Sequence, residues 1–259
     1  MKIKDIPASR KNCTVNSTDK NIMKNIISKF ADVLCDIIAP RRCIICNCFV
    51  NIGSIVCICS DCRGKLDGFG KYIVNDGKYY DEAVCALPYE GYVRNSMAEY
   101  KFRSKRYLYK TFADAVYEKI RDRSFLKEDF IICPVPMHPN RDRRYNQSEL
   151  IARRIGELTG AQVIPDLLVK IRDIKPLSSM GYSMRRLSIR DSIALNIAYY
   201  DIFGKNIILV DDIYTSGATT NECSRILKSC GCRRVTVLAA CYTELKGDTK
   251  NADADTVGV

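Results

Sequence analysis

Hydrophobic residues occur along the chain in short continuous runs and in helically spaced stripes, and the two patterns alternate. Residues 207–210 form a run of four aliphatic side chains, which predicts a strand covered on both faces, as in a parallel sheet. Behind this run, apolar side chains follow helical spacing at Cys223, Ile226, Leu227 and Cys230. Gly231 is placed to end that helix. The alternation predicts an α/β fold.

Other segments repeat the same alternation. Strands are expected at 130–133 and 235–241, and "DEAVCALPYEG" at 81–91 is interpreted as a strand that enters a turn. Helices are expected at 93–101, 111–123 and 146–158, the last ending at Gly160. Pro134 and Pro136 exclude regular ladder bonding after the strand at 130–133, because proline has no backbone N–H.

Two adjacent acids follow the run 207–210. Asp211 and Asp212 are expected where the strand leaves the sheet, the usual position of ligands in open α/β folds. A small turn rich in hydroxyl groups comes next, with Thr215, Ser216, Gly217, Ala218 and Thr219. Such a turn at a helix N-terminus offers donors to a phosphate, whereas carboxylates need sugar hydroxyls or a metal ion. The stretch therefore predicts a site for a phosphorylated sugar. Helix capping, the alternative, explains one acid and one threonine but not the whole pattern.

Four cysteines form two C-x-x-C pairs, Cys43 with Cys46 and Cys59 with Cys62. Four thiolates at this spacing are typical of a tetrahedral Zn²⁺ site. A module of residues 40–69 is too short to build a hydrophobic core of its own, so metal binding is expected to supply its folding free energy. Cys48 and Cys57 lie inside the pairs and stay open as alternative ligands, and a redox C-x-x-C is a further alternative.

The stretch "ILVDDIYTSGAT" closely resembles the phosphoribosyl diphosphate (PRPP) loop of type I phosphoribosyltransferases, and residues 37–243 resemble the ComF family. The resemblance implies a type I phosphoribosyltransferase-like parallel sheet flanked by helices and preceded by a small four-cysteine zinc module. It also implies that Asp211 and Asp212 are the catalytic residues and hold the ribose 2′ and 3′ hydroxyls, directly or through Mg²⁺. The turn from Thr215 to Thr219 would hold the 5′-phosphate.

The same resemblance gives the leaving pyrophosphate a second segment, after the strand at 130–133. The implied pyrophosphate-binding residues are Val135, Pro136, Arg141 and Arg144. The family usually has glycine where this chain has Arg144. Thr and Gln often stand at the positions of Ile174 and Leu177, so part of that pattern is lost. The basic run from Lys101 to Arg106 is interpreted either as a solvated loop or as a mobile flap over a polyphosphate.

Composition adds a charge argument. The chain has 259 residues, 47% of them hydrophobic, enough for one full core and a small annex. Lys and Arg number 41 against 30 acids, a formal charge of +11, which suits a polyphosphate, a nucleic acid, or both. Fourteen cysteines without a secretory signal argue against a disulfide scaffold, and a cytoplasmic protein is expected. The stripe at 21–39 carries four charged side chains and predicts an amphipathic helix, with no integral membrane segment.

Four segments are expected along the chain. They are an N-terminal tail with the amphipathic helix (1–39), the zinc module (40–69), the phosphoribosyltransferase-like domain (70–245) and a disordered polar tail (246–259).

Two main functions stay open at this point. The first is an enzyme that transfers ribose 5-phosphate from Mg-PRPP to an unidentified acceptor in DNA uptake. Purine-salvage enzymes of this class usually carry an acid where Thr215 stands, which argues against hypoxanthine or guanine as the acceptor. The second is a non-catalytic accessory protein that senses PRPP or a 5′-phosphorylated nucleotide. Its partners would be single-stranded DNA and a competence helicase or other DNA-processing protein. A nucleic-acid-binding zinc module with a vestigial transferase domain is a third alternative, against which the intact acid pair argues.

Overall fold

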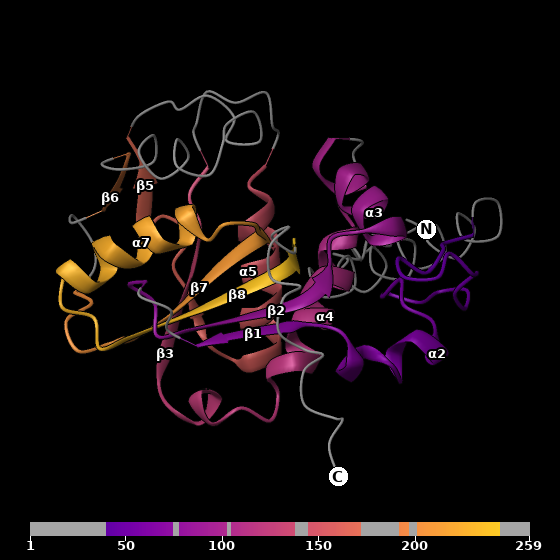
Figure 1. Cartoon of the computed structure of the whole chain (residues 1–259), viewed down its shortest axis with the longest axis horizontal. Coiled ribbons are helices and arrows are strands. Elements are labelled where there is room, and N and C mark those ends of the chain that lie inside the picture. Colours follow the sequence, from indigo (N-terminus) through magenta and orange to yellow (C-terminus); the bar gives the residue numbers. More distant parts are fainter. Residues whose placement is uncertain are drawn as a thin grey trace, which may run out of the picture.

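A mostly parallel sheet lies at the centre of the protein (Figure 1). The computed structural model describes residues 40–74, 78–102, 105–137, 145–171, 192–196 and 201–243. Across these residues the strand order in the sheet is β1-β2-β8-β7-β3-β4. The strands are β1 (Lys71–Val74), β2 (Glu82–Pro88), β3 (Phe130–Pro134), β4 (Gln162–Val163), β7 (Asn206–Tyr214) and β8 (Arg234–Tyr242). Neighbours pair in parallel except β1, which is antiparallel to β2.

Helices cover both faces of this sheet. The helices among the described residues are α2 (Ser60–Arg63), α3 (Gly91–Phe102), α4 (Leu108–Ile120), α5 (Gln147–Thr159) and α7 (Ala218–Ser229), with short 3₁₀ turns η1 (Leu66–Gly68) and η2 (Ser124–Lys127). Helices α4 and α5 pack on one face, and α7 packs on the other. A small antiparallel pair, β5 (Leu168–Lys170) and β6 (Ile193–Leu195), lies beside α7. A parallel sheet flanked by helices was the expected fold class, and it is confirmed.

The aliphatic run of β7 supplies both cores at once. Side chains alternate along a strand, so Ile208 and Val210 enter the core beneath α4 and α5. Ile207 and Leu209 enter the opposite core beneath α7. All four side chains are buried. A continuous apolar run, rather than an alternating one, is therefore what this central strand requires.

Local signals set most of the helix ends. Asn146 caps α5 by accepting a hydrogen bond from the backbone N–H of Ser148, and Gly160 ends that helix in the left-handed region at φ 75°. Gly231, at φ 82°, follows α7. Its N–H donates to the carbonyl of Lys228 and that of Cys232 donates to Leu227, a Schellman ending. The glycine stops expected from the sequence lie where they were predicted.

The four-cysteine module is not an isolated knot. Its side chains Ile44, Val56 and Ile58 belong to the same hydrophobic cluster as Phe112 and Val116 of α4. Figure 1 shows the module, in indigo, at one end of the molecule next to α3 and α4. The sequence indicated that so short a segment cannot build its own core. Packing on α4 now adds a second source of stability beside any bound metal.

Several predicted segments lie outside the described residues. They are the helix at 21–39, the residues Arg141 and Arg144, the positions Ile174 and Leu177, and the tail at 246–259. Within the part of the chain that is described, no helix combines the length and apolar character needed to cross a membrane.

Candidate functional site

The acid pair lies beyond the end of one neighbouring strand but still within the sheet. Strand β7 was expected to end near Val210, and it continues to Tyr214. Its pairing with β3 stops at Val210, whereas its pairing with β8 continues through Asp211 and beyond. The expectation that the strand leaves the sheet at Asp211 is therefore wrong, because β7 continues to Tyr214. One edge of β7 is nevertheless open beside the acids, because β3 has ended.

Asp211 is held by two hydrogen bonds to a single oxygen. Its Oδ1 accepts from the hydroxyl of Ser148 at 3.3 Å and from the backbone N–H of Asp212 at 2.8 Å. Burial raises the pKa of Asp211 to about 7, and the neighbouring negative charge of Asp212 acts in the same direction. Lys101 and the two hydrogen bonds partly oppose that rise. The second carboxyl oxygen has none of these bonds, so it is the one suited to a ligand.

Asp212 has a cation beside it from a different element. The Nζ of Lys101, near the C-terminal end of α3, lies 2.7 Å from Oδ2 of Asp212. Both side chains are only 13% exposed, so this ion pair is largely shielded from solvent. In Figure 1 the end of β7 points toward α3. The Lys101 ammonium shows that a positive charge is accommodated beside Asp212. Carboxylate oxygens are also the ligands that Mg²⁺ prefers.

The hydroxyl-rich turn leads directly into α7. Gly217 precedes the helix at φ 70°, a left-handed conformation that glycine adopts without strain. The buried Ser216 accepts from the N–H of Ala218 through its hydroxyl at 3.4 Å. Thr215, Ala218 and Thr219 keep part of their surface exposed. The first N–H groups of a helix have no carbonyl partners within it, and in α7 the N–H of Ala218 already donates to Ser216, so the N–H groups that follow are the ones suited to an anion.

A buried tyrosine packs against the turn at Gly217. A Cβ placed on Gly217 would lie 2.5 Å from the hydroxyl oxygen of Tyr214. That hydroxyl is 2.6 Å from the hydroxyl of Tyr80 and accepts from Nζ of Lys78 at 2.9 Å. The contact explains why this position requires glycine. It also fixes the turn against the segment that precedes β2.

The predicted pyrophosphate segment lies at the same edge of the sheet. Strand β3 ends at Pro134, and the N–H of Val135 adds one more bond to the carbonyl of Val210 at 2.8 Å. The carbonyl of Val135 accepts from the side chain of Asn146 at 3.0 Å. Both polar backbone groups of Val135 are thus used inside the protein. Pro136 follows directly, and the structure brings this segment, α5 and the acid pair together.

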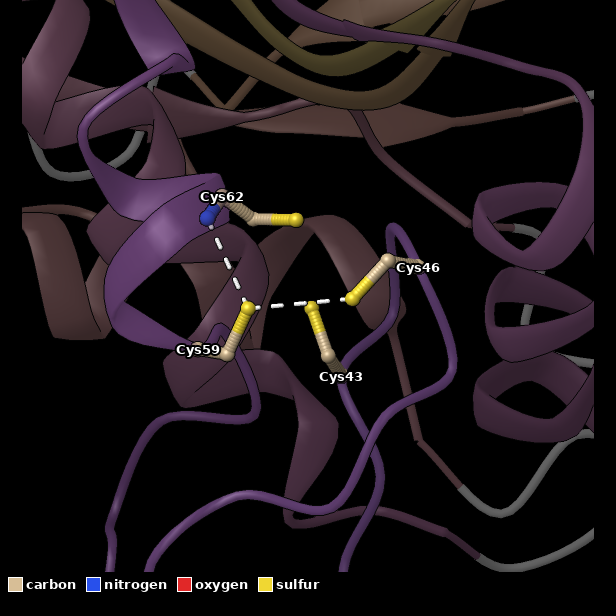
Figure 2. A group of neighbouring side chains, drawn as sticks. All are labelled: Cys43, Cys46, Cys59 and Cys62. Carbon is tan, nitrogen blue, oxygen red and sulfur yellow. Dashed lines mark hydrogen bonds between the residues drawn. The ribbon is translucent and has the colours of Figure 1, made fainter.

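The second candidate site is the cysteine cluster. The sulfur atoms of Cys43, Cys46, Cys59 and Cys62 all lie within 4.8 Å of one another. Figure 2 shows them facing one another, two from a loop and two from the start of α2. Backbone N–H groups of Ile45 and Cys62 point at the sulfurs of Cys43 and Cys59 at 3.5 Å. Such bonds stabilise thiolates, which are the metal-binding form, so the donor set fits Zn²⁺.

The two alternative cysteines differ in position. Cys57 is 1% exposed, and its N–H donates to the side chain of Thr111 on α4. Cys57 is thus part of the core and outside the sulfur cluster. Cys48 is exposed, with its sulfur 3.2 Å from that of Cys46. The pKa of Cys46 is lowered to about 6, first by the backbone N–H of Cys48 and then by this side-chain contact. Cys48 remains the one spare thiol beside the four among the described residues.

Sequence reasoning did not identify three of the residues that shape the acid site. Ser148 follows the helix start "YNQ" without any feature that points to Asp211. Tyr214 and Lys78 act through tertiary contacts. Lys101 was expected at the end of the helix at 93–101 and at the start of a basic run interpreted as a loop or flap, without any link to the acid pair. It lies in α3 and reaches the acid pair.

Proteins of similar sequence include two with competence names. The chain is 30% identical over 197 residues to competence protein ComFC of Streptococcus pneumoniae, covering 69% of this chain and 84% of that protein. It is 23% identical over 187 residues to competence protein F of Haemophilus influenzae, covering 69% and 82%. It is 25% identical over 114 residues to the DNA utilization protein YhgH of Escherichia coli O157:H7, covering 43% and 49%. No protein-family model matches. The chain belongs to the ComF family, as the resemblance predicted.

Solved structures with a similar arrangement include phosphoribosyltransferases. For adenine phosphoribosyltransferase of Saccharomyces cerevisiae the TM-score is 0.38 at 11% identity, covering 69% of this chain and 86% of that one. For glutamine PRPP amidotransferase of B. subtilis it is 0.35 at 19% identity, covering 51% and 26%. These scores are low, and the fold description rests on the sheet topology itself.

Proposed function

We propose that this protein binds Mg-PRPP at Asp211–Thr219 and transfers ribose 5-phosphate to an acceptor during DNA uptake, acting in the cytoplasm. The observation that carries the proposal is the placement of two carboxylates one short turn before a helix N-terminus. A phosphate at the start of α7 would set its attached ribose against those carboxylates. The process is suggested by the competence names of the ComF relatives.

The roles divide between the turn and the strand. Backbone N–H groups at the start of α7, with the hydroxyls of Thr215 and Thr219, would hold the 5′-phosphate. Asp211 and Asp212 would accept hydrogen bonds from the ribose 2′ and 3′ hydroxyls, with Asp211 oriented by Ser148. When bound, Mg²⁺ would supply positive charge that stabilises the leaving pyrophosphate.

Ribose transfer needs charge stabilisation rather than a protein nucleophile. The bond from C1 to the pyrophosphate oxygen breaks, the acceptor forms the new bond to C1, and pyrophosphate leaves with the electron pair. Val135, Pro136, Arg141 and Arg144 are proposed as the residues near that leaving group, as the family resemblance implies. The two arginines lie outside the described residues.

The four-cysteine module is proposed to hold a structural Zn²⁺ ion. Support comes from the four converging sulfurs and from the N–H donors aimed at two of them. With four thiolates the coordination of zinc is complete, which leaves no open position for catalysis. The proposed role is therefore to tie Cys43 and Cys46 to α2 and to hold the module on α4.

Turnover is tested by incubating the protein with Mg-PRPP and pooled bases or amines while pyrophosphate is measured. Release that requires protein and acceptor, and that Asp211→Asn abolishes, is the expected result. Binding of Mg-PRPP without release for any acceptor would favour the non-catalytic alternative, in which PRPP or a nucleotide acts as a signal. Thr111→Ser serves as the control. It is a conservative change in α4, outside the acid site, and should leave pyrophosphate release unchanged.

A second candidate function, binding of single-stranded DNA, is favoured by a groove between the module and α3. The groove has a volume of about 760 Å³, and its lining includes Arg41, Arg42, Phe49, Tyr92 and Tyr107. We call it the arginine–aromatic groove. The guanidinium of Arg42 lies 4.2 Å from the ring centre of Phe49, and that of Arg41 lies 5.1 Å from Tyr107. Phe49 is 58% exposed and Tyr92 48% exposed.

These side chains match what a single strand requires. Exposed rings give bases a stacking surface, and arginines attract the phosphate backbone. A labelled oligothymidylate should bind, measured by fluorescence anisotropy, with affinity that falls steeply as salt rises. Arg42→Ala with Phe49→Ala should weaken binding at least tenfold. Arg153→Ala with Phe203→Ala removes the same residue types outside the groove and should not. Salt-independent binding, or equal losses in the two variants, would contradict this function.

A further inference from the structure

The acid pair meets its cation through helix α3. Asp211 and Asp212 are adjacent carboxylates on β7, and Lys101 places its ammonium 2.7 Å from Asp212. Nothing in the sequence indicated this contact, because α3 and β7 lie far apart along the chain. A tethered ammonium therefore lies on one of the two groups proposed to receive the sugar and its metal ion.

The backbone that carries Lys101 is fixed from both sides. The residue before it, Tyr100, is fully buried, and its hydroxyl donates to the carbonyl of Gln147 at 2.8 Å. In return the hydroxyl of Tyr145 donates to the carbonyl of Tyr100 at 2.5 Å. The Tyr100 ring also packs on Phe112 of α4, with 5.7 Å between ring centres. The end of α3 is thus locked to the start of α5, and only the methylene chain of Lys101 can move the ammonium.

We propose that Lys101 is the internal counter-ion of the acid pair and keeps a free divalent cation from binding there. This inference rests on the proposed function of the acid site. A metal ion alone must displace an ammonium that is shielded from solvent and cannot diffuse away. A metal–polyphosphate complex brings its own anionic oxygens, which accept the displaced ammonium. Lys101 thereby makes the site select Mg²⁺ together with a diphosphate ester over Mg²⁺ alone.

Lys101 acts here as a positioning residue, and its removal should change metal affinity in a direction that structural damage does not. Lys101→Met keeps the length of the side chain and removes its charge. The carboxylate of Asp212 then lacks a cation, so the acid pair should bind a free metal ion more tightly. Loss of a merely structural contact would weaken binding or leave it unchanged.

The test is a titration with Mn²⁺ in place of Mg²⁺ and without PRPP. The signal of free aqueous Mn²⁺ in electron paramagnetic resonance reports the unbound fraction. Wild-type protein should bind weakly, and Lys101→Met should bind at least tenfold more tightly. Lys101→Gln retains a hydrogen-bond donor for Asp212 without the charge, and it should show the same tightening if the methionine variant does not fold. Lys101→Arg should remain as weak as wild type.

Lys105→Met is the matched control, because Lys105 pairs with Glu99 at 2.8 Å and not with the acid pair. Its Mn²⁺ affinity should equal that of wild type. Unchanged affinity in Lys101→Met and Lys101→Gln, or equal tightening in Lys105→Met, would overturn the inference. Since no PRPP is present, the result is separate from the proposed function. A wild type that fails to bind Mg-PRPP in calorimetry would reject that function whatever the Mn²⁺ titrations show.

Discussion

The backbone N–H of Cys57 donates a hydrogen bond to Oγ1 of Thr111, 3.0 Å away, and both residues are buried. This bond joins the four-cysteine module to helix α4, across a long interval of sequence. Cys57 lies between the two cysteine pairs, so the bond fixes the loop that connects them. It explains why a polar threonine is found in the core-facing side of α4.

Thr111→Val should destabilise the protein by about 1–3 kcal/mol, because it leaves the buried N–H of Cys57 without an acceptor. Valine has nearly the same shape as threonine, so the packing is preserved. Urea denaturation gives the free energy of unfolding, and Thr111→Ser should retain most of it. Equal stability of the valine variant and wild type would show that this bond contributes nothing.

Purified protein should contain about one zinc ion per chain, as expected for a single four-thiolate site. Cys59→Ser should lower that content, because it removes one of the four converging sulfurs. Cys48→Ser should leave the content unchanged. Inductively coupled plasma mass spectrometry measures both. Zinc loss in Cys48→Ser with full retention in Cys59→Ser would mean that Cys48 is the ligand instead.

Gly217→Ala should cost more stability and more ligand affinity than Gly204→Ala. The two glycines have nearly the same conformation, φ 70° and φ 69°, so the strain of a left-handed alanine is shared. At Gly204 an added Cβ would meet no atom within 4 Å, whereas at Gly217 it meets Tyr214. Only Gly217→Ala should also weaken Mg-PRPP binding. Similar losses of stability in both variants would exclude the tyrosine contact as the cause.

Asp211→Asn should make the protein more stable at pH 8 and flatten its stability between pH 4 and pH 7. Burial raises the folded-state pKa of Asp211 to about 7, whereas an unfolded aspartate has a pKa of about 3.9. Between these values the unfolded chain releases the proton and the folded chain keeps it, so stability falls as pH rises. Each unit of difference corresponds to about 1.4 kcal/mol.

Asparagine cannot ionise, yet its oxygen can still accept from Ser148 and from the N–H of Asp212. Thermal melting at several pH values compares the variant with wild type. A variant that is less stable than wild type at pH 8, with an unchanged pH profile, would show that the buried carboxyl is not the cause.

The sequence predicted the elements of the site better than their contacts. The run 207–210 with its acids and turn is a local pattern, and local patterns determine the strand, the turn and the helix that follow. The extension of β7 to Tyr214 depends on pairing with β8 after β3 has ended, which is a tertiary property. The approach of Lys101 to Asp212 depends on how α3 is locked to α5 by Tyr100 and Tyr145. No spacing in the sequence encodes that contact.

The cysteine module shows the same division. The spacing of two C-x-x-C pairs was sufficient to identify Cys43, Cys46, Cys59 and Cys62 as one cluster. It could not show that the module shares a core with α4, because the side chains concerned are separated along the chain and meet only after folding.

Calorimetric titration with Mg-PRPP tests the central proposal most directly. Wild-type protein should bind Mg-PRPP, and Asp211→Asn combined with Asp212→Asn should weaken binding by roughly a hundredfold or more, since each charge-assisted bond contributes about 1.5–3 kcal/mol. Thr219→Ala should cost less, because backbone donors remain. Melting curves must show that the double variant is folded, as it leaves Lys101 without its partner. A wild type that binds neither Mg-PRPP nor a 5′-nucleotide, or a folded double variant that binds as tightly, would contradict the account.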